Sequence, residues 1–188
     1  FLRPDDKIVT YSPSLFPNHI FHWNMIREFR QAEDSDALMQ KVAALLFADI
    51  LEDPRNAIWA GPAAETFCAF CRVILKRYRN CPTNREVIMA MKNLPANKLL
   101  NHIAMLPEHY GMLQSYFDYV IHSSRNYHIT RRGADIRFIF NQALEKFSGT
   151  FLNSDGNDTI HDFLAGNGDK RLFIVHDDGS AEISSVFE

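Results

Sequence analysis

Residues 67–79 read FCAFCRVILKRYR, and this stretch decides the fold class. Its apolar residues recur at three- and four-residue spacing while its basic residues fall mostly on the other side, the pattern of an amphipathic helix with a basic outer face. Pro62 is expected in the first turn of this helix or at a kink in it. The apolar positions are Phe67, Phe70, Cys71, Ile74, Leu75 and Tyr78.

Similar apolar spacing predicts helices along most of the remaining chain. Thr83 and Glu86 form a capping box, in which each side chain satisfies a free backbone N–H at a helix start. The spacing predicts helices over residues 34–50, 83–94, 99–106, 107–120 and 136–147. The fold class predicted is mainly α, with about six helices in the middle of the chain.

Short apolar runs flank the helical part. Lys7–Tyr11 and Leu172–Val175 read as strands, the second buried on both faces, and a terminal helix is expected from Ser180 or Ala181. A helical insert whose two ends return to strands is best explained as an excursion from a parallel α/β sheet that lies mostly outside the chain.

Composition narrows the class of protein. The chain has 188 residues, 46% of them hydrophobic, and a formal net charge of −3, which excludes a surface that is basic throughout. Three cysteines do not make a disulfide framework and indicate a reducing compartment. No apolar run reaches about 18 residues, so we expect a soluble unit. Because the chain begins at Phe1 without a methionine, we expect a piece of a longer protein.

The motifs of common catalytic and metal sites are incomplete in this sequence. Nothing matches the phosphate-binding pattern G-x-x-x-x-G-K-[ST], so the chain is not expected to hydrolyse ATP. Cys68 and Cys71 share a helix face with Cys81 nearby, but zinc would need a second ligand pair, which favours core cysteines. His19 and His22 lack the carboxylate of a zinc protease motif and are predicted to be structural or surface residues.

Two acidic stretches have similarly plain interpretations. Residues 155–158, Asp-Gly-Asn-Asp, are rich in oxygen ligands, but they lack the glycine and glutamate of a calcium loop and are predicted to form a solvated loop. Asp177 and Asp178 follow a strand as magnesium-binding acids do in nucleotide motors, although His176 interrupts that step. A turn at the strand end is the favoured interpretation.

Two clusters of basic residues are the candidate site for DNA or another substrate. One lies at the end of the helix over 67–79, and the other contains an aromatic residue. Cations beside stacking groups are typical of single-stranded nucleic-acid sites, although cations at a helix C-terminus are also favoured by the helix dipole. The candidate residues are Lys76, Arg77, Arg79, Arg125, Tyr127, Arg131 and Arg132.

The order of several short motifs over some 180 residues resembles the coupling proteins of type IV secretion and conjugation systems. Those motifs are Ile8-Val9, His22–Glu28, Ile58-Trp59-Ala60 with Ala63–Phe67, Pro82-Thr83, and His161–Leu164 followed by the strand Leu172–Val175. Gly61-Pro62, and Cys68 with Cys71, depart from that pattern and leave the branch of the family, and so the type of substrate, open.

The resemblance implies a compact all-α substrate-recognition domain over residues 17–165. Residues 1–16 and 166–188 would belong to the nucleotide-binding domain of a RecA-like hexameric ATPase, which would supply ATP and Mg²⁺ at motifs outside the chain. The chain itself would hold no catalytic residue, cofactor or metal. The parent would be anchored at the cytoplasmic side of the bacterial inner membrane, and the isolated chain would be a soluble monomer.

The implied partners are transferred proteins, relaxosome proteins, other secretion components and, weakly, DNA. Two alternatives remain open. One is a helical protein-interaction domain of another RecA-like DNA-pumping ATPase, which would lack two upstream transmembrane helices. The other is a small helical enzyme that uses the cysteines and histidines.

Overall fold

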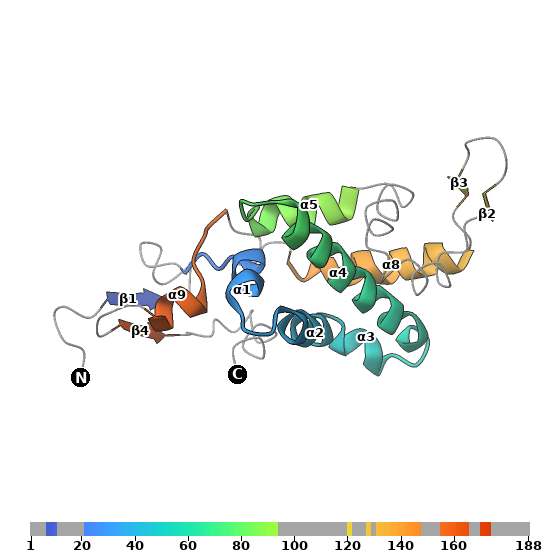
Figure 1. The fold of residues 1–188 in the computed structure, drawn as a ribbon. Helices are drawn as coiled ribbons and strands as arrows, with labels where there is room; N and C mark the ends of the chain where they lie inside the picture. Colours follow the sequence, from blue (N-terminus) through green and yellow to red (C-terminus); the bar gives the residue numbers. More distant parts are fainter. Residues whose placement is uncertain are drawn as a thin grey trace.

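The computed structural model describes residues 7–10, 21–93, 120–121, 127–128, 131–147, 155–165 and 170–173. This part of the chain is mainly helical, which confirms the predicted fold class (Figure 1). Its helices are α1 (Met25–Gln31), α2 (Ser35–Leu46), α3 (Ala48–Glu52), α4 (Ala57–Arg77), α5 (Asn84–Asn93), α8 (Arg131–Glu145) and α9 (Ile160–Ala165). Its strands are β1 (Lys7–Thr10), β2 (Val120–Ile121), β3 (Tyr127–His128) and β4 (Lys170–Phe173).

Helix α4 is the centre of the helical part and packs against α2, α3 and α8. Most of the apolar stripe recognised in the sequence faces the core, where Phe67, Cys71 and Ile74 are buried, but Tyr78 at its end is 56% exposed. Residues of α8, among them Ile136 and Phe140, complete the same core. Among the described helices α4 is long and apolar enough to cross a membrane, but 61% of its most apolar window is buried inside the protein. It therefore serves as the central core helix here.

The sequence predicts one helix over 34–50, whereas the structure has a break at Phe47 between α2 and α3. Phe47 is fully buried, and its backbone has φ −101° and ψ 3°, outside the helical region. Asp34 begins α2 by accepting a hydrogen bond from the N–H of Ala37 (2.8 Å). The helix is thus interrupted at the residue whose ring is buried in the core.

Helix α4 begins earlier than the sequence suggests, at Ala57, so Pro62 lies in its second turn. Proline has no N–H to donate to the preceding turn. The carbonyl oxygen of Pro62 still accepts a hydrogen bond from the Thr66 hydroxyl (2.8 Å). The helix thus continues through Pro62, although the prediction placed this residue in the first turn or at a kink.

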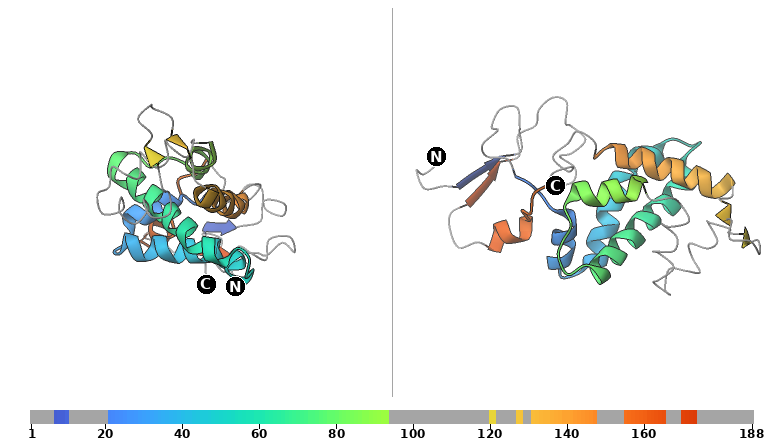
Figure 2. Two further views of the ribbon diagram at one scale, coloured as in Figure 1. Left: turned by 90° about the vertical axis from the view of Figure 1, so that its right-hand side faces the viewer. Right: turned by 90° about the horizontal axis from the view of Figure 1, so that it is seen from above.

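The two pairs of strands are short. In the first pair β1 lies parallel to β4, with Lys7 opposite Lys170 and Thr10 opposite Phe173. Figure 2 shows this pair at one end of the protein, with α9 as the helix nearest to it. In the second pair β2 lies antiparallel to β3. A helix carrying Val120 was predicted; this is wrong at Val120, which pairs in β2 with His128. Branched Val120 and Ile121 both favour extended backbone.

Several predicted features lie outside the described residues. These are the helix over 99–106, the rest of the helix expected over 107–120, the terminal helix from 180, the acids at 177–178, His19 and Arg125.

Candidate functional site

A buried polar cluster ties α1 to α5 and to the segment before α9. Asn24 is fully buried, and its side-chain oxygen accepts a hydrogen bond from the N–H of Arg27 (2.8 Å), so that it caps α1. Its Nδ2 donates to the carbonyl oxygens of Pro82 (3.0 Å) and Gly156 (3.2 Å). One side chain thereby connects three segments that are far apart in the sequence.

Asn84, at the start of α5, is equally buried and completes the connection. Its Nδ2 donates to the carbonyl oxygen of Trp23 (2.8 Å), and its Oδ1 accepts from the N–H of Met25 (2.8 Å). Both donor and acceptor are used, which is the condition under which a buried amide does not destabilise a protein.

Glu28 of α1 is the charged member of the cluster and is 9% exposed. Its carboxylate accepts hydrogen bonds from the indole N–H of Trp23 (3.0 Å) and from the backbone N–H groups of Ile160 (2.7 Å) and His161 (3.1 Å). It thus lies at the N-terminus of α9, where a negative charge is favourable. We call Asn24, Glu28 and Asn84 the polar hub.

Residues 155–158 are held by their backbone. Asp158 and Trp23 form a parallel bridge, in which the N–H of Asn24 donates to the carbonyl oxygen of Asp158 (2.8 Å). A Cβ at Gly156 would lie 1.8 Å from the Cβ of His22. The prediction of exposed side chains holds for Asp155, Asn157 and Asp158. The predicted solvated loop is therefore correct for these side chains, but the backbone of the segment is fixed to residues 22–24.

The cysteines of α4 lie in the core, as the sequence favours. Cys68 is 5% exposed and Cys71 is fully buried, and burial raises the pKa of the Cys68 thiol to about 11 and that of Cys71 well above its usual range. Such thiols are poor nucleophiles and poor metal ligands at neutral pH. Cys81 is half-buried. Within the described ranges no group of three or more His, Cys, Asp or Glu side chains could hold a metal.

The structure brings together some of the candidate basic residues and separates others. Lys76, Arg77 and Arg79 are exposed at the C-terminal end of α4. Arg131 is exposed at the start of α8, which lies at the opposite end of the helical part (Figure 1). Tyr127 in β3 and Arg132 in α8 are described by their backbone alone, and Arg125 lies outside the described residues. The side chains that the structure places therefore form a cluster at one end, with Arg131 away from it.

Arg30 of α1 joins this cluster, which the sequence did not indicate. Its guanidinium donates hydrogen bonds to the carbonyl oxygen of Leu75 (3.4 Å) in the last turn of α4 and to those of Tyr78 and Arg79 just after the helix. A cation at a helix C-terminus is favoured by the helix dipole. We call Arg30, Lys76, Arg77 and Arg79 the basic end of α4.

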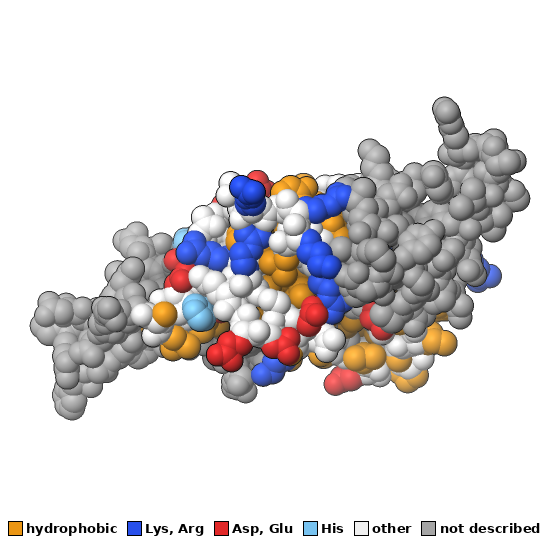
Figure 3. All heavy atoms as spheres, viewed as in Figure 1, with side chains coloured by type: hydrophobic (Ala, Val, Ile, Leu, Met, Phe, Trp, Pro, Cys, Tyr) orange, Lys and Arg blue, Asp and Glu red, His pale blue; other side chains and the backbone are white. Residues whose placement is uncertain are grey.

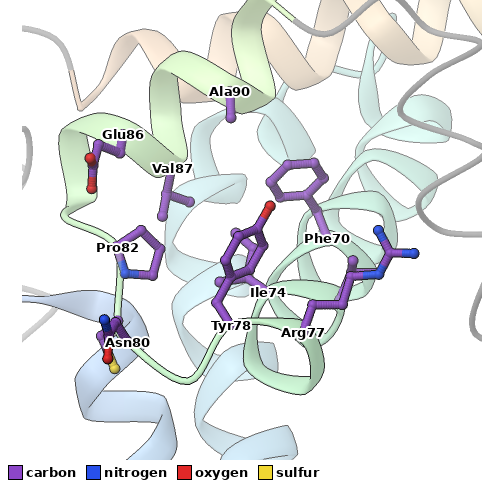
Figure 4. Close-up of a pocket in the computed structure, with 11 residues that line it drawn as sticks. Phe70, Ile74, Arg77, Tyr78, Asn80, Pro82, Glu86, Val87 and Ala90 are labelled. Atoms are coloured by element: carbon purple, nitrogen blue, oxygen red, sulfur yellow. The ribbon is translucent and has the colours of Figure 1, made fainter.

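Beside this basic end, a groove of about 520 Å³ opens between α4 and α5 (Figure 4). Figure 4 shows the rings of Phe70 and Tyr78 on one side and Val87 and Ala90 on the other. Tyr78 is 56% exposed. The α4–α5 groove is lined by Phe70, Val73, Ile74, Arg77, Tyr78, Asn80, Cys81, Pro82, Glu86, Val87 and Ala90.

The charges around the α4–α5 groove are mostly positive. Residues 76–86 include four basic side chains and one acidic one, Glu86. The Glu86 carboxylate accepts hydrogen bonds from the N–H (2.9 Å) and the hydroxyl (3.2 Å) of Thr83, and the N–H of Glu86 donates to that hydroxyl in return, which confirms the capping box. Figure 3 shows hydrophobic side chains exposed over the middle of this face, with Lys and Arg on both sides.

A second hollow lies on the other side of the end of α4 and is acidic. Asp34 and Asp36 line it with Arg72. Asp34 caps α2, and Asp36 forms an ion pair with Arg72 (2.6 Å). Because these carboxylates already have structural partners, the α4–α5 groove is the stronger candidate for binding.

Comparisons with known proteins found no matching family model, no matching curated protein and no matching solved structure. What the chain does must therefore be inferred from its own residues.

Proposed function

We propose that this chain is the substrate-recognition domain of a type IV secretion coupling protein and that the α4–α5 groove binds the proteins to be transferred. The chain would act by binding, and the parent motor would hydrolyse ATP with Mg²⁺. Neither catalysis nor a cofactor is needed in the chain for this role. The parent would act at the cytoplasmic side of the bacterial inner membrane.

The open, apolar α4–α5 groove is the observation on which this proposal rests. Its volume of about 520 Å³ lies within the range of binding pockets, roughly 300–1,000 Å³. Tyr78, in its lining, exposes 56% of its surface. Apolar side chains that remain exposed together mark sites of protein interaction.

The pairing of β1 with β4 supports an insert in a larger α/β protein. Strands that pair in parallel need a long crossover, and here the crossover contains every helix described. Two short strands are marginally stable by themselves, so a pair of four-residue strands is expected to have further strands beside it or helices packed on it. The remainder of the parent would supply them. A DNA-pumping ATPase outside secretion would satisfy the same argument, and the cargo distinguishes the two.

Guidance of DNA is the second candidate function, supported by the basic end of α4. The 21 residues of α4 span about 30 Å and separate this cluster from Arg131. The candidate cations whose side chains the structure describes thus do not follow a single track for a nucleic-acid strand. Protein recognition fits the apolar groove better.

Photocrosslinking in cells tests the proposal. A photoreactive amino acid would replace Tyr78 in the full-length parent protein and, as a matched control, Lys41 on the exposed side of α2. We expect exported proteins to crosslink to position 78 and not to position 41, and their export to decrease with Ala90→Glu. Equal crosslinking at both positions, or export that does not change with Ala90→Glu, would contradict the proposal.

A further inference from the structure

The chemistry of the α4–α5 groove narrows the class of partner beyond the proposed function, on which this inference rests. We propose that the groove binds an amphipathic helix of a partner protein whose polar face is acidic. The partner would insert apolar side chains between α4 and α5 and place carboxylates over the basic end of α4.

The shape of the groove suits a helix. Two helices form its walls, with Phe70 and Tyr78 on one wall and Val87 and Ala90 on the other, across a single channel (Figure 4). Phe70 and Val87 are buried and form the apolar floor, whereas Tyr78 is exposed and Ala90 is half-buried at the surface. An amphipathic helix binds such a channel through residues at i, i+3 or i+4, and i+7.

The charged side chains around the groove indicate the sign of the charge that the partner should carry. Arg77 lines the groove, and Arg79 is exposed close to it, whereas Lys76 lines the second hollow. The opposing acid, Glu86, has its carboxylate engaged by Thr83 in the capping box. Arg85, at the start of α5, forms an ion pair with Asp155 (3.2 Å). Arg77 and Arg79 place positive charge at the α4 end of the groove, where carboxylates would be attracted and a basic segment repelled.

A nucleic-acid strand would complement the positive charge but not the apolar surface of the groove. Its phosphates would pair with Arg77 and Arg79, but it has no apolar stripe to cover Phe70, Val87 and Ala90. Phosphate contacts also weaken steeply with salt, whereas burial of apolar surface persists. The two kinds of partner are therefore separable by salt and by substitution of the groove.

The test uses the whole chain and designed helices of about 18 residues, or five turns. Three of them, the striped helices, would share one apolar stripe and have an acidic, a neutral or a basic polar face. A fourth, acidic helix would have serine in place of the stripe. Affinities would be measured by fluorescence anisotropy across a salt series, with labelled single-stranded DNA beside them. The chain variants would be Arg77→Glu with Arg79→Glu, Tyr78→Ser, and Lys41→Glu as the matched surface control.

We expect the acidic helix to bind about tenfold more tightly than the basic one, since two exposed charge pairs contribute this much. Arg77→Glu with Arg79→Glu should abolish or invert that order, Tyr78→Ser should weaken every helix that has the stripe, and Lys41→Glu should change nothing. Equal binding of the three striped helices would overturn the inference while leaving protein recognition intact. Binding of DNA alone, or of the helix without the stripe as tightly as the striped one, would overturn both.

Discussion

The polar hub and the α4–α5 groove lie on the two sides of the same linker, residues 78–83, and differ in almost every physical respect. In the hub, Asn24 and Asn84 are fully buried and their side chains are used in hydrogen bonds to the backbone. In the groove, apolar side chains such as Tyr78 remain exposed.

The difference separates the part that holds the fold from the part that is left for binding. The hub connects segments that are far apart in the sequence, so a substitution there should lower the free energy of unfolding. The groove leaves apolar surface in water, which costs stability and is typical of functional sites. Substitutions in it should change binding and leave folding almost unchanged.

The largest effect is expected from Asn84→Ala. The N–H of Met25 and the carbonyl of Trp23 would lose their partners while buried, which costs about 2–4 kcal/mol. Asn80→Ala is the matched control, because Asn80 is exposed at the rim of the groove, and its change should remain within about 0.5 kcal/mol. Urea unfolding followed by circular dichroism measures both. Equal losses would contradict the distinction between hub and groove.

A smaller loss is expected from Gly156→Ala. The new Cβ would lie 1.8 Å from the Cβ of His22, so the backbone bridge between residues 22–24 and 156–158 must shift, at a cost of about 1–3 kcal/mol. Gly61→Ala is the matched control, because a Cβ at Gly61 meets nothing within 4 Å. In α4 that control should raise stability by about 0.5–1 kcal/mol. If both glycine variants changed the stability in the same direction, this account of Gly156 would be refuted.

Ala90→Glu should leave stability within about 0.5 kcal/mol of the original, because Ala90 is only partly buried at the groove surface. It should weaken binding of the acidic striped helix about tenfold, since it places a like charge in the apolar channel. Anisotropy and urea unfolding of the same preparation measure the two quantities. Loss of folding in parallel with binding would mean that the groove is part of the structural core.

The smallest effect concerns Glu65 of α4, which contrasts with Glu28 of the hub. Burial raises the pKa of the Glu65 carboxyl, with Arg72 opposing the shift, and among the described residues its Oε2 has no hydrogen-bond partner. A carboxyl whose pKa is higher in the folded state stabilises the protein as pH falls through that raised pKa.

Glu65→Gln should therefore raise the free energy of unfolding at pH 7 by a few tenths of a kcal/mol, a value reduced by solvent screening. It should also remove part of the gain in stability seen on acidification toward the ordinary carboxyl range. Glu28→Gln should lower stability at pH 7. Unfolding curves at neutral and mildly acidic pH compare the two variants, and a fall in stability for Glu65→Gln at pH 7 is the adverse result.

Local patterns in the sequence predicted the long helices well. The stripe of Phe67, Cys71 and Ile74 and the pairing of Thr83 with Glu86 depend on neighbours in the chain, and both are present. The short helices α1 and α9 were not singled out, because seven and six residues give too little periodicity. The break at Phe47 depends on tertiary burial of one ring, which periodicity does not contain.

The candidate site was predicted only in part. Lys76, Arg77 and Arg79 form a cluster because they follow one another at the end of a helix. Arg30 joins them, and Arg131 lies elsewhere, because of how α1 and α8 pack against α4. The groove itself requires α5 to lie beside α4, a contact that no motif in either helix specifies.

Alkylation of Cys81 tests most directly whether the groove is open and is the binding surface. Cys81 lines it, whereas Cys68 and Cys71 lie in the core with raised thiol pKa values. In the whole chain we predict that iodoacetamide modifies Cys81 at least about tenfold faster than Cys68 or Cys71, as followed by mass spectrometry. A saturating acidic striped helix should slow the reaction of Cys81 severalfold and leave the other two unchanged. Modification of Cys81 at the same rate in the complex as in the free chain would contradict the account.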